Sequence, residues 1–529
     1  MRVAFTVGSL DTAGDWAGLE QALGDGHPEV VRNTIRHLEI LGAKSYVVEE
    51  PYIDRDYSAD YLEFYARTFR THARHCRRAH FFSKDVSPLV SASLSTAGLR
   101  ELRKLATDAY CGFCVLRPLP TAPVGRTVLR GRLRDHQDMD PTVTCRAPFE
   151  ANLLGIDLEV AGAAYLQQDA RVGACAQVAI WAGMRHLHAR YGYDWVSVAD
   201  ITRLATPTAP DEAVSLPAGS DFLTSERMIR AIAEAGYQPL CFRNPDAAKP
   251  SIAAAILPYV ESGIPVILGL NLGGEVGHAV TVIGRIFGRQ NTPTAPAIDY
   301  VPAYIVHDDQ GGPYMSLPVR DPADSPHPFS QDTVQRGSTE LNMTHATFAV
   351  ALMSTRVFST AAAAEFSAHD RIDDTLRHMP HIRAMLAKQK LPINERLLDE
   401  LQDARVCGRM VLRTYLSSAA GYRRHIEGTN ASDDLKDALL DLHLPHFTWI
   451  TEICTVDSYN QVSAGMRRMY GHTIIDATST GKGRDAILML HLPGLVFTNN
   501  VDALRGEPQE QLSIIENDDL YTCREKRLD

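Results

Sequence analysis

The chain has 529 residues, of which 45% are hydrophobic and 22% charged, and its net charge is −11 at pH 7. Because this length exceeds what one hydrophobic core supports, we expect roughly two to four domains. The negative charge argues against a general attraction to nucleic acid or to an anionic membrane, and no run of about eighteen apolar residues predicts a membrane span.

The start of the chain and its cysteines indicate a reduced, cytoplasmic protein. The first residues, MRVAFTVGSL, lack the basic and long apolar segments of a signal peptide. The nine cysteines are scattered, which is typical of reduced thiols. Cys111 and Cys114 form a C-x-x-C motif, but no second pair follows at zinc spacing. We interpret both as structural thiols and expect no metal and no cofactor.

The first 150 residues combine helix and strand patterns and are expected to form an α/β region of unknown function. A long predicted helix ends in an Arg- and His-rich segment, which we interpret as a solvated face, with a patch for an acidic partner or a phosphate as the alternative. Residues 135–148 are polar and are expected to form a loop. The pattern predicts helices at residues 32–41, 58–78 and 99–110, and strands at residues 45–49, 110–117 and 127–133.

Residues 151–335 are expected to form a central unit around a helix that starts at Cys175. The sequence from Cys175 is almost wholly apolar for about ten residues, which predicts a helix buried on all sides. Backbone N–H groups and the helix dipole at the first turn favour the negative charge of a thiolate nucleophile. The alternative is a buried structural thiol, which is the common state of a free cysteine.

Two helices and a series of strands follow this helix. Thr224 is a candidate N-cap for the first of them, and Gly236 is expected to end it. Helices that precede a β-meander predict an α+β fold for the unit. The predicted helices cover residues 224–235 and 251–262, and the predicted strands cover residues 264–270, 278–287 and 304–308.

Residues 336–529 are expected to form a helical region followed by a β-hairpin. The helical part covers residues 361–423 and is broken near Pro380 and Pro392. A strand is predicted at residues 446–454, and the segments HTIIDAT and DAILMLHLP form the hairpin. The TGKG sequence between them lacks the spacing of a phosphate-binding loop and precedes a strand, so we predict no nucleotide site there.

A catalytic thiol needs a base, and His278 is the candidate. It begins a strand after a glycine-containing turn, where the backbone leaves room for a substrate. A lone strand histidine is often structural, and His186, His188 and His307 are rivals. At about 1.5 Å per residue, the first two lie too far along the helix from Cys175.

Asp308 is the candidate carboxylate that orients the base. It ends an apolar strand, where it is expected to accept a hydrogen bond from Nδ1 of His278. Asp309 follows directly and is expected to point the other way. The alternative for both residues is an Asx turn before two glycines.

Two glutamines upstream of the cysteine are candidates for the oxyanion donor, together with the backbone N–H of Cys175. Gln168 lies seven residues before the cysteine. We prefer it to Gln167 because its offset from the cysteine is closer to that expected.

The segments QQDARVGACA, GHAVTVIG and YIVHDD, in this order, resemble a papain-like cysteine peptidase. The likeness covers residues 160–315 and is nearest to the double-glycine peptidases that process bacteriocin leaders. It implies an α+β papain-like core in which the buried Cys helix packs on an antiparallel sheet. It also implies roles for Gln168 as oxyanion donor, Cys175 as nucleophile, His278 as base and Asp308 as orienter. Alanines flank the cysteine, where the family has Asp and Gly.

The sequence therefore predicts a cysteine hydrolase that cleaves a peptide, isopeptide or amide bond in a protein or peptide substrate. An acyl transferase with the same triad, similar to transglutaminases, is one alternative. A catalytically inactive binding protein with a papain-like fold is another. The sequence leaves the oligomeric state open.

Overall fold

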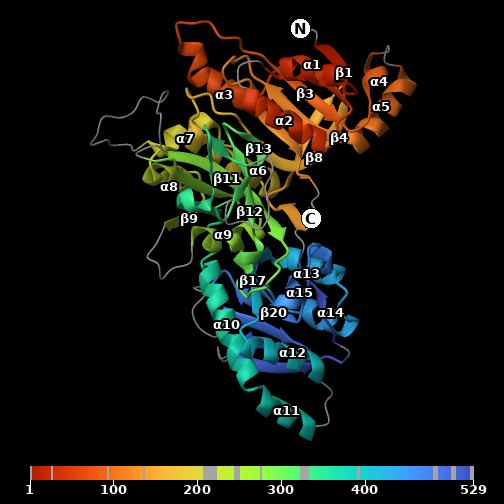
Figure 1. Ribbon diagram of the computed structural model, residues 1–529, viewed down its shortest axis with the longest axis vertical. Coiled ribbons are helices and arrows are strands. Elements are labelled where there is room, and N and C mark those ends of the chain that lie inside the picture. Colours follow the sequence, from red (N-terminus) through yellow and green to blue (C-terminus); the bar gives the residue numbers. More distant parts are fainter. Residues whose placement is uncertain are drawn as a thin grey trace.

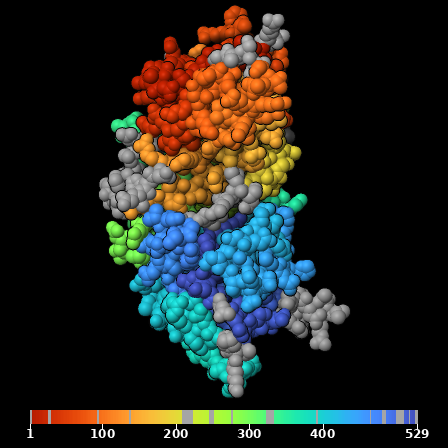
Figure 2. Space-filling view, turned by 90° about the vertical axis from the view of Figure 1, so that its right-hand side faces the viewer, coloured from red at the N-terminus to blue at the C-terminus, as the bar shows by residue number. Residues whose placement is uncertain are grey.

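The computed structural model describes residues 3–24, 28–91, 95–134, 138–206, 223–243, 251–273, 277–321, 333–389, 393–479, 486–501, 508–516 and 518–524. Within these residues the predicted α+β class is confirmed. Three large sheets have seven, seven and six strands, and every ladder between their strands is antiparallel. The sheets follow one another along the long axis of the molecule (Figure 1). The space-filling view shows the same order as successive bands of colour (Figure 2).

The N-terminal sheet is antiparallel, so the expected α/β region is in fact α+β. Its strands, in order across the sheet, are β1 (Ala4–Ser9), β2 (Ser45–Tyr52), β3 (Cys76–Phe82), β4 (Tyr110–Leu116), β5 (Val124–Arg130), β8 (Ile156–Tyr165) and β7 (Ala147–Leu153). Its helices are α1 (Ala13–Leu23), α2 (Pro28–Ile40), α3 (Arg55–Glu63), α4 (Ser87–Ser91) and α5 (Thr96–Ala109).

The helix predicted at residues 58–78 is wrong beyond Glu63, apart from a short 3-10 turn at Tyr65–Arg67. Helix α3 ends at Glu63, and most of the Arg- and His-rich tail leads into strand β3. Arg78 of this strand is buried, because its guanidinium pairs with Glu49 and stacks on the Tyr52 ring, 4.1 Å from the ring centroid. An arginine that is paired inside a sheet has the same sequence signature as one on a solvated helix face.

The central sheet takes strands from outside the segment 151–335. Its strands, in order, are β13 (Gly312–Pro318), β12 (Ala303–Asp308), β11 (Gly277–Gly288), β10 (Val266–Asn271), β16 (Ala346–Met353) and β9 (Gln238–Arg243), and β6 (Met139–Val143) pairs with part of β11. The expected loop at residues 135–148 therefore contains a strand. The divisions at residues 150 and 335 do not coincide with the sheets.

Four helices accompany the central sheet. They are α6 (Cys175–Tyr191), α7 (Val198–Ala205), α8 (Ser225–Glu234) and α9 (Ile252–Glu261). Thr224 caps α8 by accepting a hydrogen bond from the N–H of Arg227, as predicted. The helices predicted at residues 224–235 and 251–262 are thus confirmed, as are the three strands that follow them.

The C-terminal sheet contains a strand within the region predicted as mostly helical. Its strands, in order, are β17 (Met410–Ser418), β18 (Phe447–Thr455), β20 (Gly471–Asp476), β21 (Ile487–Leu492), β22 (Leu495–Val501) and β23 (Pro508–Ile514). The helices are α10 (Ala361–Arg377), α11 (Met379–Lys388), α12 (Glu395–Val406), α13 (Ala419–Gly428), α14 (Asp433–Leu440) and α15 (Val456–Tyr459). Strand β17 alternates buried and half-buried residues along most of its length. The two-residue repeat of a strand therefore describes this segment better than the helical repeat predicted for it.

Two short antiparallel strand pairs complete the fold: β14 (Gln335–Arg336) with β15 (Thr339–Glu340), which are adjacent in sequence, and β19 (Arg468–Met469) with β24 (Tyr521–Thr522), which are distant in sequence. Among the described residues, no helix is both long enough and apolar enough to cross a bilayer.

Helix α6 is enclosed between the central sheet and the N-terminal region. Its residues from Ala176 to Leu187 are all buried, as the sequence predicts. Thr281 of β11 donates a hydrogen bond to the carbonyl of Ala179, 2.8 Å away. From the other side, the carboxylate of Asp56 in α3 accepts hydrogen bonds from Trp181 and from Arg185, at 2.9 and 2.7 Å. The N-terminal region therefore helps to fix the helix that carries the cysteine.

Candidate active site

Cys175 is the first residue of α6, and a tight turn delivers the chain to it. The Oδ1 atom of Asp169 accepts hydrogen bonds from the backbone N–H groups of residues 171–173, at 2.9–3.0 Å. Ala170 has a φ of 54°, a left-handed conformation that the turn imposes. The hydroxyl of Tyr65, just after α3, donates to the other carboxylate oxygen of Asp169, 2.6 Å away. The half-buried thiol is thus held on a rigid loop at the start of a buried helix.

His278 lies between the thiol and a carboxylate. Its side chain is hydrogen-bonded to Cys175, and its Nε2 atom is 3.0 Å from Oδ1 of Asp308. Asp308 was expected to bind Nδ1, so the ring is turned the other way. The three residues come from α6, β11 and β12, which are separated in sequence and brought together by the sheet.

The charges around His278 favour the imidazolium form. Burial lowers the pKa of His278, but the charge of Asp308, its hydrogen bond, the hydrogen bond to Cys175 and the charge of Asp309 outweigh burial and raise this pKa to about 10. At neutral pH the ring therefore carries a proton. An imidazolium beside a thiol stabilises the thiolate and can later protonate a leaving group.

Asp308 combines the two roles that the sequence left as alternatives. It orients His278, and its Oδ1 atom also accepts the backbone N–H of Gln310 at 3.1 Å, which is an Asx turn. A Cβ atom at Gly311 would lie 2.7 Å from Oδ2 of Asp308, so glycine is needed there to leave room for the carboxylate. Asn33 of α2 donates to the carbonyl of Gly311 at 2.7 Å and fixes this turn from the N-terminal region.

Asp309 also faces the histidine, and the expectation that it points away is wrong. Its Oδ1 atom is 3.7 Å from Nε2 of His278. The pairing of β12 with β13 shifts register between Val306 and Asp308, so simple alternation of side chains fails at this end of the strand. Burial and the neighbouring charge of Asp308 raise the pKa of Asp309 to about 7, although the charges of His278 and of an arginine oppose this.

That arginine, Arg336, is a member of the site that sequence reasoning missed. Its guanidinium contacts both carboxylate oxygens of Asp308, at 2.6 and 2.9 Å, and also contacts Nε2 of His278. It belongs to the two-residue strand β14, and 58 residues separate it from His278. No local signal distinguishes such a residue from an ordinary surface arginine.

His278, Asp308 and Asp309 also offer one ligand atom each within 4.8 Å of one another, which is the spacing of a metal site. The guanidinium of Arg336 forms a bidentate contact with Asp308 and touches the ring of His278. A fixed positive charge at this place opposes a cation, so these side chains suit a proton-transfer site better than a metal centre.

The two glutamines differ in what they contact. Gln167 is buried, and its Oε1 atom accepts the backbone N–H of Val124 at 3.0 Å, while its carbonyl accepts from Arg117 at 2.7 Å. This side chain therefore extends the pairing of the N-terminal sheet. Gln168 directly follows Gln167 in the chain and is half-buried. Its role as oxyanion donor stays a prediction, and Gln167 is the weaker candidate.

The rival histidines lie outside the triad. Nδ1 of His188 lies 2.5 Å from the carbonyl of Tyr193. Nδ1 of His307 accepts the backbone N–H of Tyr314 at 3.1 Å, and burial lowers the pKa of His307 to about 3. His186 is buried within α6 and packs edge-on against Tyr191. None of these contacts involves the thiol of Cys175.

No model of a known protein family matches this chain, and a search of curated proteins finds no match to it. The likeness to double-glycine peptidases therefore stays a prediction, and the geometry of the site is what bears on function.

Proposed function

We propose that the chain is a cysteine hydrolase that cleaves a peptide, isopeptide or amide bond, with a papain-like core around α6 and the central sheet. The observation that carries the proposal is the ring of His278, which contacts the thiol of Cys175 and the carboxylate of Asp308 at the start of a buried helix. Nucleophile, base and orienter are the three groups that acyl transfer through a thiol requires.

In the proposed reaction, the thiolate of Cys175 attacks the carbonyl carbon of the substrate and forms a C–S bond. The oxyanion accepts hydrogen bonds from the backbone N–H of Cys175 and from the amide of Gln168. The imidazolium of His278 gives its proton to the leaving nitrogen as the C–N bond breaks. The neutral ring then takes a proton from water as the water oxygen attacks the acyl carbon. The C–S bond breaks, a carboxylic acid is released, and the thiolate and the imidazolium are regenerated.

The test is labelling with a peptide vinyl sulfone at pH 7, with the adduct located by mass spectrometry. Cys241 and Cys407 are exposed and serve as internal controls. Burial raises the pKa of the Cys241 thiol, so Cys407 is the measure of ordinary thiol reactivity. We expect Cys175 to react at least tenfold faster than the two control thiols, and His278→Ala to abolish this advantage without changing the labelling of the controls.

Turnover is measured on a peptide library, with products identified by mass spectrometry. We expect wild-type protein to cleave members of the library and Cys175→Ala to cleave none. Equal labelling of the three cysteines, or cleavage that survives Cys175→Ala, would refute the proposal. Repeating the assay with added hydroxylamine separates hydrolysis from transfer, because only a transferase gives mainly the hydroxamate at low amine concentration.

A further inference from the structure

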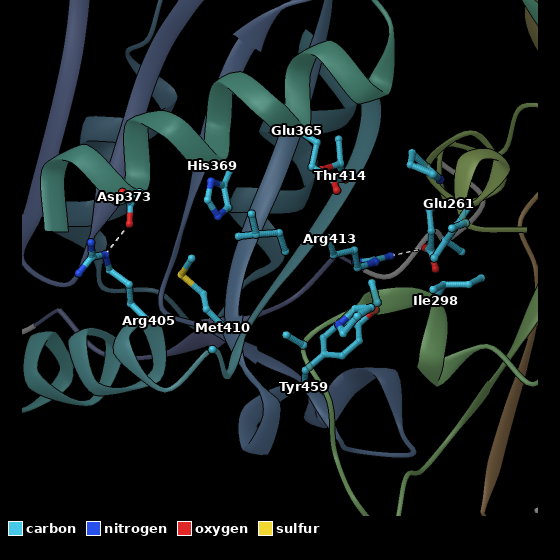
Figure 3. Close-up of a pocket in the computed structure, with 18 residues that line it drawn as sticks. Glu261, Ile298, Glu365, His369, Asp373, Arg405, Met410, Arg413, Thr414 and Tyr459 are labelled. Carbon is cyan, nitrogen blue, oxygen red and sulfur yellow. Dashed lines mark hydrogen bonds and ion pairs between the residues drawn. The ribbon is translucent and has the colours of Figure 1, made fainter. Parts of the chain in front are cut away.

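A cavity lies between the central unit and the C-terminal sheet, away from the triad. Its volume is about 460 Å³, and its walls come from α9, the short helix η2 (Ala297–Tyr300), α10, α12 and β17 (Figure 3). Cavities of roughly 300–1,000 Å³ at junctions between structural units are typical of small-molecule sites. None of the four predicted catalytic residues lines this cavity.

The positive charges in the cavity wall are already neutralised. Arg413 contacts the carboxylates of Glu261 and Glu452, at 2.6 and 2.9 Å. Arg405 contacts Asp373 of α10 at 2.7 Å. Figure 3 shows the Arg413–Glu261 and Arg405–Asp373 pairs at opposite ends of the cavity. The wall therefore offers no unpaired arginine to an anionic ligand.

Glu365 is the remaining acid of the wall. It lies on α10 two turns before Asp373, hydrogen-bonds to Thr414 of β17, and has no lysine or arginine within ion-pair distance in the described parts of the chain. Burial raises the pKa of Glu365. Glu261 and Asp373, the other two acids of the wall, are paired with arginines, whereas Glu365 is not.

His369 lies one turn beyond Glu365 on α10 and is exposed at the cavity. The ring of His369 interacts electrostatically with the carboxylate of Glu365, and neither a lysine nor an arginine forms an ion pair with Glu365 among the described residues. A half-buried carboxylate without a lysine or arginine partner gains from a ligand that brings a cation.

The rest of the wall is largely apolar. Leu257 and Pro258 of α9, Ile298 of η2, and Met410 and Leu412 of β17 face the same space. A ligand that fills the cavity thus needs an apolar body as well as a charged group.

We propose that this cavity binds a small organic cation, a protonated primary amine carried on an apolar chain or ring. The ammonium group pairs with Glu365 and lies near the hydroxyl of Thr414, and the apolar body packs on Met410 and Leu412. The site is independent of the proposed hydrolase activity, because it shares no residue with the triad.

The probe is n-hexylammonium, titrated at pH 7.5 and followed by ligand-observed NMR. We expect saturable binding, and n-hexanoate and n-hexanol of the same chain length to bind at least tenfold more weakly. Glu365→Gln keeps the shape of the side chain and should weaken binding of the amine about tenfold, since it removes a charge-assisted hydrogen bond.

Asp370→Asn is the matched control. Asp370 lies on the same helix, is exposed and does not line the cavity, so this variant should bind the amine as wild type does. Cys175→Ala should also bind it normally, which separates this proposal from the hydrolase. Absence of saturable binding, equal affinity for hexanoate, or unchanged affinity in a folded Glu365→Gln variant would overturn the proposal.

Discussion

Asp308→Asn is the change that most directly tests the proposed triad. The pKa of His278 is raised from its ordinary value of 6.5 to about 10. This difference of about 3.5 pH units corresponds to about 5 kcal/mol in favour of the imidazolium. The charge of Asp308 and its hydrogen bond are the two largest contributions that raise this pKa. An amide at position 308 removes the charge and leaves the guanidinium of Arg336 beside the ring, so we expect this pKa to fall by about 2 pH units or more.

Two measurements follow from this fall. The kcat/KM of wild-type protein should decline as the pH rises through about 10, where the imidazolium loses its proton. In Asp308→Asn the same decline should move to about pH 8 or below. At pH 7 we expect kcat/KM to fall about 10²- to 10⁴-fold, the range that general acid–base catalysis contributes.

Asp309→Asn provides the matched comparison, because it is the same chemical change one residue further along. The carboxyl of Asp309 has a pKa of about 7 and so carries only part of a charge at neutral pH. We expect less than a tenfold loss of kcat/KM at pH 7 and little movement of the alkaline limb. A larger loss for Asp309→Asn than for Asp308→Asn, with both variants folded, would refute the assignment of the orienting carboxylate.

Three further predictions test the surroundings of the triad. Gln168→Ala should lower kcat about 10²-fold with the thermal midpoint unchanged, whereas Gln167→Ala should lower the midpoint because it removes a buried hydrogen bond; the opposite pattern would exchange their roles. Tyr65→Phe should lower kcat/KM about tenfold in a folded protein, since the hydroxyl of Tyr65 anchors the turn before the cysteine. Full activity of this variant would show that the turn keeps its conformation without that hydrogen bond. The raised pKa of Asp309 means that the folded protein binds a proton more tightly than the unfolded chain, so stability is lost as pH rises from about 4 through 7. Asp309→Asn should therefore raise the thermal midpoint more at pH 8 than at pH 4. Calorimetry at the two pH values measures both shifts, and shifts of equal size would contradict the prediction.

The sequence predicts those parts of the fold whose causes are local. Helix α6 follows from an apolar segment without a polar face, and α8 follows from Thr224 as its cap. The thiol, the base and the carboxylate could be proposed because each stands at the start or end of such an element. Their order along the chain was enough to suggest that a sheet brings them together.

Residues that act through distant partners could not be predicted in this way. Strands β6 and β16 join the central sheet from outside the expected unit, and their pairing depends on β11 and β10. Arg78 is buried because Glu49 and Tyr52 of the neighbouring strand and the carbonyl of Asn152 all contact its guanidinium. Asp309 faces His278 because of a shift in strand register that leaves no mark on the sequence.

Arg336 has a consequence for the charge of the whole cluster. Asp308 contributes one negative charge, while His278 as imidazolium and Arg336 contribute two positive charges. Because the pKa of Asp309 is about 7, this residue carries only part of a negative charge at neutral pH, and the buried cluster keeps an excess of positive charge. In the proposed mechanism, an anionic sulfur at Cys175 balances this excess. A carboxylate alone behind the histidine would leave the ring and Asp308 as a closed neutral pair with no need for the anionic sulfur. Arg336 changes this balance, because Asp308 then pairs with both Arg336 and His278. Asp308 therefore neutralises the imidazolium only in part, and the remaining positive charge can stabilise the sulfur of the proposed nucleophile.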